Sequence, residues 1–461
     1  MPRRDPIVQP TLLRDAAERA IRYLEGLDDR AVRPLPAAVE ALARLHAPLP
    51  EGPQDARATL ALLDEACSAA TMAMAGPRFF GFVIGAALPA TVAAGWLASA
   101  WDQNTGLYEP TPATATLEEV ALAWMLDLFG LPATAAGAFV TGATMANFTA
   151  LAAARNATLA GAGWDVEGLG LIGAPPVTVV AGEEAHPTLL KSIGLLGLGR
   201  KRVVRVPVDG QGRMRADALP DLSGPTIVCL QAGNVNTGAS DPFAELIPRA
   251  RSRGAWVHVD GAFGLWAMAS PALATGLSGL AGADSWATDA HKWLNTPYDC
   301  GLAFVRDGHA LRAAMAITAE YLPTETPHRN PSDHTPELSR RARGVEVWAA
   351  LRTLGRSGVV DLIERCCRHA RRFAAGLEAA GFEVLNDVVL NQVLVAFGDP
   401  ETTRRAIAAI QEDGTCWCGA TVWQGRTAMR ISVSGWATDE ADVERSLEAM
   451  IRCARATAVR A

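Results

Sequence analysis

Hydrophobic residues recur at intervals of three and four near the start of the chain, which is the period of an amphipathic helix. The segments DAAERAIRYLEGL and DARATLALLDEACSAATMAM both show this period. A helical region of this kind often packs on a partner subunit. We therefore predict an N-terminal helical arm over residues 1–75 that contributes to a dimer contact.

The pattern changes near residue 140, where short β-rich runs alternate with helical stretches rich in Ala and Leu. Repeated strand–helix–strand units build a mainly parallel sheet with helices on both faces. We therefore expect a large α/β domain over residues 76–355. Its predicted strands are PVTVVAG, RVVRVPV, TIVCLQAG, AWVHVDG, SWATDA and GLAFVRD.

A third pattern begins after residue 355 and predicts a small C-terminal α+β domain over residues 356–461. The expected strands are GFEVLND, NQVLVAFG, ATVWQGR and MRISVSG, followed by a helix around DEADVERSLEAMIRCARA. Before this domain, residues 321–341 hold four prolines and show no periodicity. A long segment without periodicity inside a compact domain is typical of an active-site lid or a disordered loop.

Composition narrows the class of partner. The chain has 461 residues, of which 49% are hydrophobic and 20% charged, as expected for a globular protein of two or three domains. Its net charge of -7 and the lack of a sustained basic block argue against a nucleic-acid surface. A small-molecule substrate is the expected partner.

The sequence offers little sign of secretion, membrane insertion or metal binding. No apolar run follows the basic residues at the N-terminus, so we expect a cytoplasmic protein. The uncharged run at 81–100 is long enough to span a membrane, but Pro89 and its many small residues favour a buried loop and helix. The eight cysteines lack paired zinc spacing, which favours reduced, mostly buried thiols and no metal.

Two short motifs suggest chemistry that their context does not support. GLGLIG at 168–173 matches a dinucleotide-binding pattern, but it precedes a predicted strand and is followed by Ala-Pro-Pro. A dinucleotide site needs a strand before the glycines and a helix after them. CWC at 416–418 could indicate metal or redox chemistry, but buried cysteines are the simpler interpretation.

Candidate chemistry gathers where predicted strands end. In an open parallel sheet, ligands bind beyond the carboxyl ends of the strands, so residues there should face one crevice. Four positions satisfy this condition: the turn Gly142, Ala143 and Thr144 before a helix, His186, Asp260 and Lys292.

Each of these positions alone has an ordinary explanation, such as tight packing, a surface histidine, a helix cap or an exposed lysine. Together they predict a specific cofactor. A helix N-terminus can hold a phosphate, and a lysine at a buried strand end can attack an aldehyde. Combined with an imidazole and a carboxylate, these groups match what pyridoxal 5'-phosphate (PLP) requires.

Four stretches carry a family resemblance in the same order: TGATMANFTAL, EEAHPTLLKS, HVDGAFG and TDAHKWLNTPYDCG. Together with PRFFGFVIGAALPA and MRISVSGWATDEADV, they resemble the group II PLP-dependent amino acid decarboxylases, which include aromatic-L-amino-acid and glutamate decarboxylases. The resemblance implies a homodimeric fold-type I enzyme. It also implies that an L-amino acid is decarboxylated to an amine and CO2 through a Lys292 aldimine and a quinonoid intermediate.

The resemblance assigns a role to each matching residue. Lys292 would carry the internal aldimine, Asp260 would pair with the pyridine nitrogen, and His186 would stack on the ring. The other implied cofactor contacts are Gly142, Ala143 and Thr144 at the phosphate, His291 beside it, Ala262 under the ring, and Asp289. Asp289 departs from the asparagine usual in the aromatic-amino-acid branch, so a nearby donor must offset its charge.

A second departure concerns the proton donor. Family members commonly place a tyrosine on the loop, but none lies within residues 322–339 and Tyr321 is at the loop's base. His334 has roughly the tyrosine's place and could donate a proton, although a solvated loop histidine is an equal alternative. Relatives without this tyrosine can let O2 intercept the reaction, which gives an aldehyde, ammonia and peroxide.

The substrate is predicted least directly. The stretches FFGFVIG and WDQNTGLYEP resemble the family's pocket segments and would suit an aromatic or apolar side chain, although such residues can simply fill a core. The predicted substrate contacts are Phe80, Phe82, Trp101 and Asn104. Arg430 is either a carboxylate contact or part of a structural ion pair. Another PLP lyase, an aminotransferase and a catalytically silent relative remain alternatives.

Overall fold

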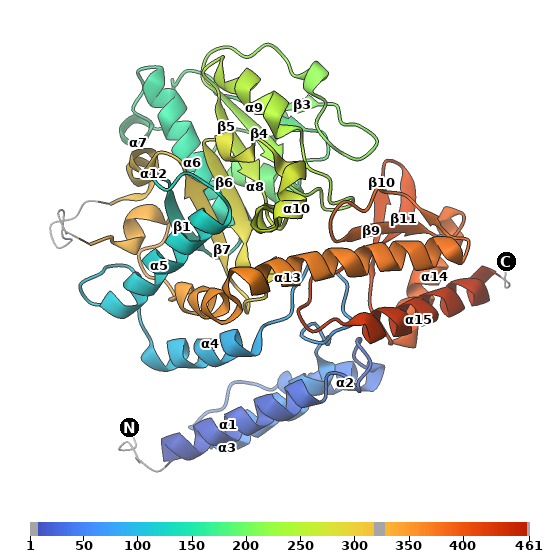
Figure 1. Cartoon of the computed structure of the whole chain (residues 1–461). Coiled ribbons are helices and arrows are strands. Elements are labelled where there is room, and N and C mark those ends of the chain that lie inside the picture. Colours follow the sequence, from blue (N-terminus) through green and yellow to red (C-terminus); the bar gives the residue numbers. More distant parts are fainter. Residues whose placement is uncertain (1–7, 318–327, 459–461) are drawn as a thin grey trace.

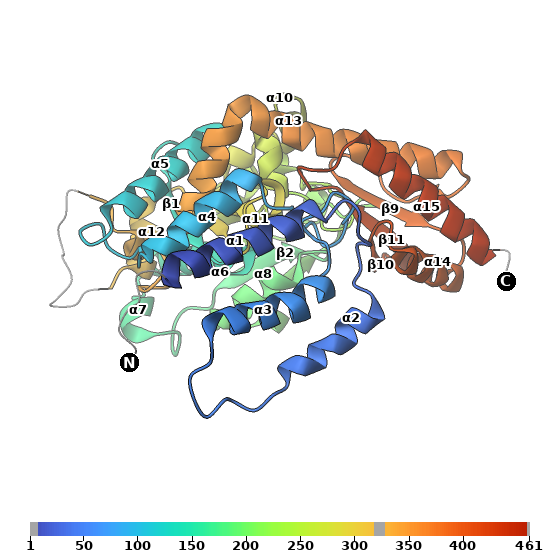
Figure 2. The ribbon, with the colours of Figure 1, turned by 90° about the horizontal axis from the view of Figure 1, so that it is seen from below.

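The computed structural model describes residues 8–317 and 328–458 (Figure 1). A helical arm at the N-terminal end consists of α1 (Val8–Glu25), α2 (Pro36–Ala41) and α3 (Ala56–Cys67). Figure 2, seen from below, places this arm in front of the rest of the chain. The arm joins the body through a small apolar cluster in which Leu27 and Val32 pack with Phe79.

A seven-stranded sheet forms the centre of the large domain. Its order is β1-β7-β6-β5-β4-β2-β3, and β7 is antiparallel to both of its neighbours. The remaining strand pairs in this sheet are parallel. The strand bounds are β1 Ala136–Val140, β2 Thr178–Gly182, β3 Val204–Val206, β4 Thr226–Gln231, β5 Trp256–Asp260, β6 Ser285–Asp289 and β7 Gly301–Val305. The predicted mainly parallel sheet is therefore confirmed.

All six predicted strands of this sheet are present, but β1 was not predicted. Its sequence, AGAFV, contains only one β-branched residue, so its local propensity for a strand is weak. The strand is stabilised instead by pairing with β7. The two strands are antiparallel, with Ala136 opposite Val305 at one end and Val140 opposite Gly301 at the other. This strand matters for function because it leads directly into the turn at Gly142.

Helices cover both faces of the sheet. Helix α6 (Ala143–Gly161) packs across one face, with α8 (Pro187–Leu195) and α12 (Gly308–Met315) beside it. Alanines dominate where α6 meets the sheet, and small side chains let a helix approach the strands closely. The opposite face is covered by α5 (Pro112–Leu128) and α9 (Phe243–Arg251). The short helices α7 (Val166–Leu169), α10 (Pro271–Ala274) and α11 (Ala290–Trp293) lie in connections.

The C-terminal region contains a second, antiparallel sheet of order β10-β11-β9-β8. Its strands are β8 Glu383–Val384, β9 Gln392–Ala396, β10 Gly419–Trp423 and β11 Arg426–Ser432, and helices α14 (Pro400–Asp413) and α15 (Glu440–Ala458) pack against each other beside it. The four predicted strands and the final helix are therefore present, although β8 is shorter than expected.

Helix α13 (Gly344–Ala379) connects the two regions and is broken at Gly355, whose φ is 60° and ψ is -179°. The predicted domain boundary at 355–356 falls at this break, and the division into three domains remains a prediction. The apolar run at 81–100 forms a loop followed by α4 (Pro89–Trp101). Within residues 8–317 and 328–458, no helix is long and apolar enough to cross a membrane.

Candidate active site

A cleft of about 600 Å³ lies between the large sheet and the C-terminal sheet. Lys292, Asp260 and His186 all line it, as their positions beyond the carboxyl ends of β6, β5 and β2 predict. Arg430 from β11 and Ala262 also face the same space. The remaining walls come from Phe82, Val83, Glu184, Pro187, Gln231, Gly233, Val235, Asn236, Phe263, Thr421, Val422, Trp423 and Gln424.

His186 is held in place at the start of α8. Its Nδ1 lies 2.7 Å from Thr188 Oγ1 and accepts a hydrogen bond from the Thr188 N–H at 3.3 Å. Pro187 occupies the first helical position, which fixes the entry of the chain into the helix. Burial lowers the pKa of His186, so the ring is neutral at neutral pH and can lie flat against an aromatic ligand.

Asp260 is the last residue of β5 and is almost fully buried, with 4% of its surface exposed. One carboxylate oxygen accepts a hydrogen bond from Asn147 Nδ2 at 3.2 Å, and the other accepts from the Ala262 N–H at 3.3 Å. Burial raises the pKa of this carboxyl, while charges on His186 and Lys292 oppose the change. Among the described residues no cation lies within ion-pair distance of Asp260. A buried carboxylate in this state suits a cationic ligand atom.

Lys292 Nζ lies 3.0 Å from Asp289 Oδ2. The other oxygen of Asp289 accepts the Ala143 N–H at 2.5 Å, at the first turn of α6. Asp289 therefore occupies the anion-binding end of that helix, where backbone N–H groups and the helix dipole favour negative charge. These contacts identify the donors that offset the carboxylate, which the sequence left open.

His291 lies beside the same carboxylate, and burial lowers the pKa of its imidazole. Its Nε2 lies 3.6 Å from Asp289 Oδ2, and its Nδ1 accepts the Cys300 N–H at 3.0 Å. The ring of Tyr298 stacks on the imidazole with centroids 4.3 Å apart. A side chain at Gly142 would bring its Cβ to 3.3 Å from the His291 ring, so glycine keeps this corner open.

These residues fit PLP. The cleft offers an amine, a buried carboxylate without a cationic partner among the described residues and a neutral imidazole, and Asp289 links the amine to the start of the 19-residue helix α6. Ala143 contributes its N–H, and Thr144 follows it with a side chain that remains partly accessible. The chemistry of this donor set matches an aromatic aldehyde with a ring nitrogen and a phosphate.

Only one of the four predicted substrate contacts lines the cleft. Phe82 does so, with 58% of its surface exposed. Phe80 is 1% exposed and packs edge-on against Phe373, because the chain turns at Phe82, whose φ is 55°, so the two rings do not share a face as they would in an extended segment. Trp101 ends α4 and is 44% exposed, while the Asn104 side chain accepts the Arg340 N–H. The structure places these three outside the cleft of the same chain.

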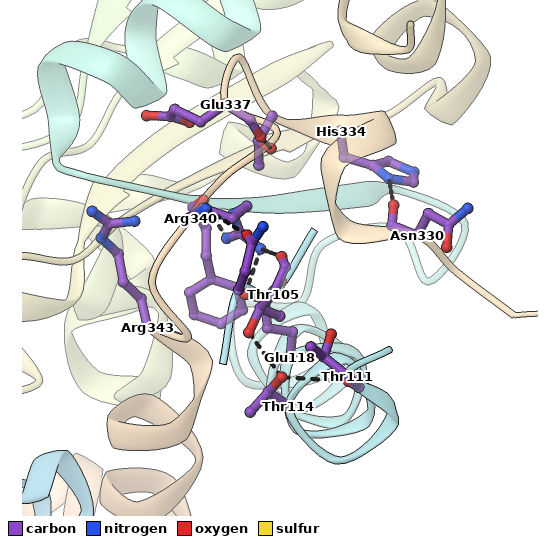
Figure 3. Close-up of polar contacts among 12 residues, drawn as sticks. Thr105, Thr111, Thr114, Glu118, Asn330, His334, Glu337, Arg340 and Arg343 are labelled. Carbon is purple, nitrogen blue, oxygen red and sulfur yellow. Dashed lines mark hydrogen bonds and ion pairs between the residues drawn. The ribbon is translucent and has the colours of Figure 1, made fainter. Parts of the chain in front are cut away.

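The structure does not bring His334 to the cleft either. Figure 3 shows its ring turned toward Asn330, whose carbonyl oxygen lies 3.2 Å from Nδ1. The short helical turn that contains His334 packs against β1 and α12 instead. Burial lowers the pKa of His334 to about 3, so a buried neutral imidazole replaces the predicted proton donor. Tyr321 and the rest of 321–327 lie outside the described residues.

The described part of the predicted lid is anchored by buried charge. Arg340 donates to Glu118 Oε1 at 2.7 Å and to the carbonyl oxygens of Thr105 and Phe139, each at 2.8 Å (Figure 3). Arg329 lies 3.7 Å from the other Glu118 oxygen. Arg340 and Glu118 are completely buried, so this triad fixes residues 329–340 to α5.

The sequence analysis missed one cleft residue, Glu184, and left two roles open for another, Arg430. Glu184 accepts hydrogen bonds from Asn234, Trp423 and Gln424, at 3.1, 3.0 and 2.9 Å, which joins the large domain to β10. Arg430 has no ion-pair partner among the described residues, and burial lowers its pKa. The structural ion pair considered for Arg430 is therefore absent from that part of the chain. The hydrogen bonds of Glu184 could not be found without knowing how the two sheets face each other.

Comparisons with known proteins agree with this site. Residues 47–398 match the sequence model of the family described as the pyridoxal-dependent decarboxylase conserved domain. The chain is 30% identical over 392 residues to L-2,4-diaminobutyrate decarboxylase of Rhizobium meliloti, covering 80% of this chain and 76% of the relative. It is 28% identical over 418 residues to tryptophan decarboxylase 1 of Oryza sativa, covering 81% and 79%. The crystal structure of Oryza sativa TDC with PLP and tryptamine shares the fold, with a TM-score of 0.88, 23% identity and 99% of each chain covered.

Proposed function

The chain belongs to the pyridoxal-dependent decarboxylase family, and we propose that Lys292, Asp260 and His186 form the centre at which it decarboxylates an L-amino acid with an aromatic or apolar side chain. The protein is a PLP-dependent amino acid decarboxylase. The observation that carries the proposed site is the convergence of these three side chains in one cleft. When bound, the cofactor supplies an electron sink for the carbon that loses CO2.

Each residue has a role that its surroundings support. Lys292 would hold the aldehyde of the cofactor, and its amine, released when the amino group of the substrate takes its place, would return a proton near the reacting carbon. Asp260, buried and hydrogen-bonded by Asn147, would keep the ring nitrogen protonated, because opposite charges close together favour the charged forms. His186 would cover one face of the ring. Ala143, Thr144 and His291 would bind the phosphate.

Arg430 would bind the carboxylate of the incoming amino acid. It lines the cleft with Lys292, and among the described residues no carboxylate neutralises it. A guanidinium binds a carboxylate with two parallel hydrogen bonds, which fixes the orientation of the substrate as well as its position. Orientation is decisive here, because the bond to the leaving CO2 must stand perpendicular to the cofactor ring.

The apolar walls of the cleft support the proposed substrate class. Phe82 and Val422 are more than half exposed, at 58% and 69%, although both line the cleft. Such side chains gain by covering an aromatic or aliphatic group. Glu184 is the cleft residue that would instead favour a substrate with a cationic side chain. Both of its carboxylate oxygens, however, already accept hydrogen bonds, from Asn234, Trp423 and Gln424.

We propose further that the enzyme works as a homodimer in the cytoplasm. The arm and α4 expose large apolar residues, which is the pattern of a surface that a second copy covers. These residues are Leu13, Ile21, Leu24, Trp96, Leu97 and Trp101. All eight cysteines are free, which supports a reducing compartment. The net charge of -7 supports a small-molecule partner without nucleic acid or membrane.

A second candidate outcome is oxidative deamination to an aldehyde. The observation that favours it is the burial of His334 away from the cleft, since no other described residue of 328–341 is a tyrosine or histidine apart from His328. His328 stacks on Tyr108, with ring centroids 3.8 Å apart. Without a proton donor from this segment, O2 has more time to react with the carbanion.

The test measures CO2 release, O2 uptake and product mass together, using PLP-loaded protein and a panel of L-amino acids. Tryptophan, phenylalanine and leucine represent the proposed class, and 2,4-diaminobutyrate and glutamate represent charged alternatives. CO2 and amine from an aromatic or apolar substrate, without O2 uptake, are expected. CO2 with equimolar O2 uptake and aldehyde would select the second candidate. Preference for a charged substrate would contradict the proposed class, and no CO2 from any of them would contradict decarboxylation.

A further inference from the structure

Behind Asp260, a line of buried hydrogen bonds runs through the large domain. Trp256, His258 and Asp260 alternate along β5, so their side chains share one face of the strand. Trp256 Nε1 donates to Ser285 Oγ at 2.9 Å, and Ser285 Oγ lies 2.9 Å from His258 Nδ1. His258 Nε2 lies 2.8 Å from Asn147 Oδ1, and Asn147 Nδ2 donates to Asp260 at 3.2 Å.

The chemistry of the groups fixes the direction of every bond in this line. Asp260 as a carboxylate only accepts, so the amide nitrogen of Asn147 must face it. The amide oxygen then faces His258 and must accept the proton on Nε2. A neutral imidazole with its proton on Nε2 leaves Nδ1 to accept the Ser285 hydroxyl, whose oxygen accepts from Trp256. Every donor therefore points toward Asp260.

Burial makes this arrangement persistent. Asn147, His258 and Ser285 are all 0% exposed, so water does not compete for their polar atoms. Burial also lowers the pKa of His258 to about 3, which keeps the ring neutral and the tautomer unchanged. Consecutive hydrogen bonds that point the same way polarise one another, which strengthens the last bond of the line.

We propose that Asn147 and His258 are positioning residues that hold Asp260 as an oriented carboxylate for the ring nitrogen of PLP. This inference rests on the proposed function, in which Asp260 pairs with that nitrogen. His258 fixes the amide of Asn147, and Asn147 fixes and stabilises the carboxylate. The family resemblance identified Asp260, but nothing in the sequence pattern connected Asn147 or Ser285 to it.

A consequence follows for the pH dependence of cofactor binding. Asp260 pairs with the ring nitrogen only while it is ionised, and the Asn147 hydrogen bond favours the ionised form. The other titratable groups facing Asp260 are His186 and Lys292, whose positive charges also favour the ionised form whenever they are protonated, and both are the same in every variant. Weakening these hydrogen bonds should therefore raise the pKa of Asp260. As the solution is acidified, PLP affinity should then begin to fall at a higher pH, which we call a raised acid limit.

The experiment compares two substitutions of one residue in the full-length enzyme, stripped of PLP and reloaded with it. His258→Leu removes the donor to Asn147, whereas His258→Gln retains an amide donor near the position of Nε2. The readouts are the dissociation constant of PLP across pH and the visible absorption of the bound cofactor. Thr149→Val is the matched control, because Thr149 is buried on α6 and its hydroxyl has no hydrogen-bond partner in the described chain.

We expect His258→Leu to weaken PLP binding about tenfold, in line with the loss of one strong buried hydrogen bond, and to move its acid limit upward. The dissociation constant of PLP for His258→Gln should stay within about threefold of that for the unmodified chain. Equal behaviour of the Leu variant and the unmodified chain would overturn the proposal, as would equal losses in the Leu and Gln variants.

If His258→Leu does not fold, Ser285→Ala decides the question. This variant removes the hydroxyl behind His258 while leaving Asn147 and Asp260 in place, and a threefold weaker PLP affinity with a raised acid limit is expected. An unchanged PLP affinity and acid limit would overturn the proposal. If the unmodified chain itself shows no visible absorption with PLP, the proposed function fails. If only the variants behave otherwise than expected, the positioning proposal alone fails.

Discussion

The ammonium of Lys292 lies 3.0 Å from the carboxylate of Asp289, whose other oxygen accepts the Ala143 N–H at the start of α6. Asp289 thus contacts both groups that are proposed to hold the aldehyde and the phosphate of the cofactor. Bound PLP would engage both groups and leave this carboxylate beside a phosphate. His291 then lies beside Asp289, with Nε2 3.6 Å from Oδ2, and burial lowers the pKa of its imidazole.

Asp289→Asn should tighten PLP binding at least about fivefold, because it removes a like-charge contact that is worth about 1 kcal/mol at 4 Å even in bulk water, and Asp289 is buried. The gain should increase as pH rises, since the phosphate then carries more negative charge. Equilibrium titration with PLP across pH measures this effect. Asp299→Asn is the control, because Asp299 pairs with Arg343 at 2.9 Å. Weaker PLP binding by Asp289→Asn would show that Asp289 helps to hold the cofactor.

Arg430→Gln should raise the KM for the amino acid substrate at least tenfold, because a charge-assisted hydrogen bond contributes about 1.5–3 kcal/mol. PLP affinity should stay unchanged, since Arg430 is proposed to contact the substrate alone. Arg426→Gln provides the control on the same strand, where Arg426 forms an exposed pair with Glu383. An unchanged KM in Arg430→Gln would remove Arg430 from the substrate site.

Glu118→Ala should destabilise the protein by about 3–5 kcal/mol, because it leaves the buried charge of Arg340 without its partner. Chemical denaturation of the PLP-free protein measures the free energy of unfolding. Glu119→Ala is the neighbouring control, since Glu119 is exposed on the same helix. Equal stability of the two variants would mean that Arg340 is satisfied by the carbonyl oxygens of Thr105 and Phe139 alone.

His334→Gln should make the free energy of unfolding less sensitive to acid. Burial lowers the pKa of His334 from 6.5 to about 3, so the unfolded chain binds a proton between those values and the folded chain does not. The contribution of the neutral, buried His334 to the free energy of unfolding is complete above pH 6.5. It is lost as the pH falls toward 3, at about 1.4 kcal/mol per pH unit. His309→Gln, at an exposed histidine, is the control.

The same variant tests the catalytic hypothesis for His334. Because the structure places this residue against β1 and α12, turnover and the ratio of amine to aldehyde should not change in His334→Gln. A shift toward aldehyde would contradict that expectation and restore His334 as the proton donor.

Sequence reasoning recovered the parts of this protein that repeat a local pattern. Strands β2 to β7 alternate with helices in the sequence, and residues at their carboxyl ends were placed in one crevice by a general rule. By contrast, AGAFV became a strand only through pairing with β7, which no local pattern reveals. Phe80 and Phe82 look alike in sequence, yet one faces α13 and the other the cleft. The Glu118 triad and the line behind Asp260 join residues 27 to 222 positions apart, so only the folded chain shows them.

The central claim is that Lys292 holds PLP in this cleft, and one measurement tests it most directly. The PLP-loaded protein is reduced with borohydride, which makes the lysine attachment permanent, and its peptides are mapped by mass spectrometry. The sequence contains only three lysines, Lys191, Lys201 and Lys292, so the assignment is unambiguous. We predict a phosphopyridoxyl group on Lys292 alone. A label on Lys191 or Lys201, or no label at all, would contradict the account.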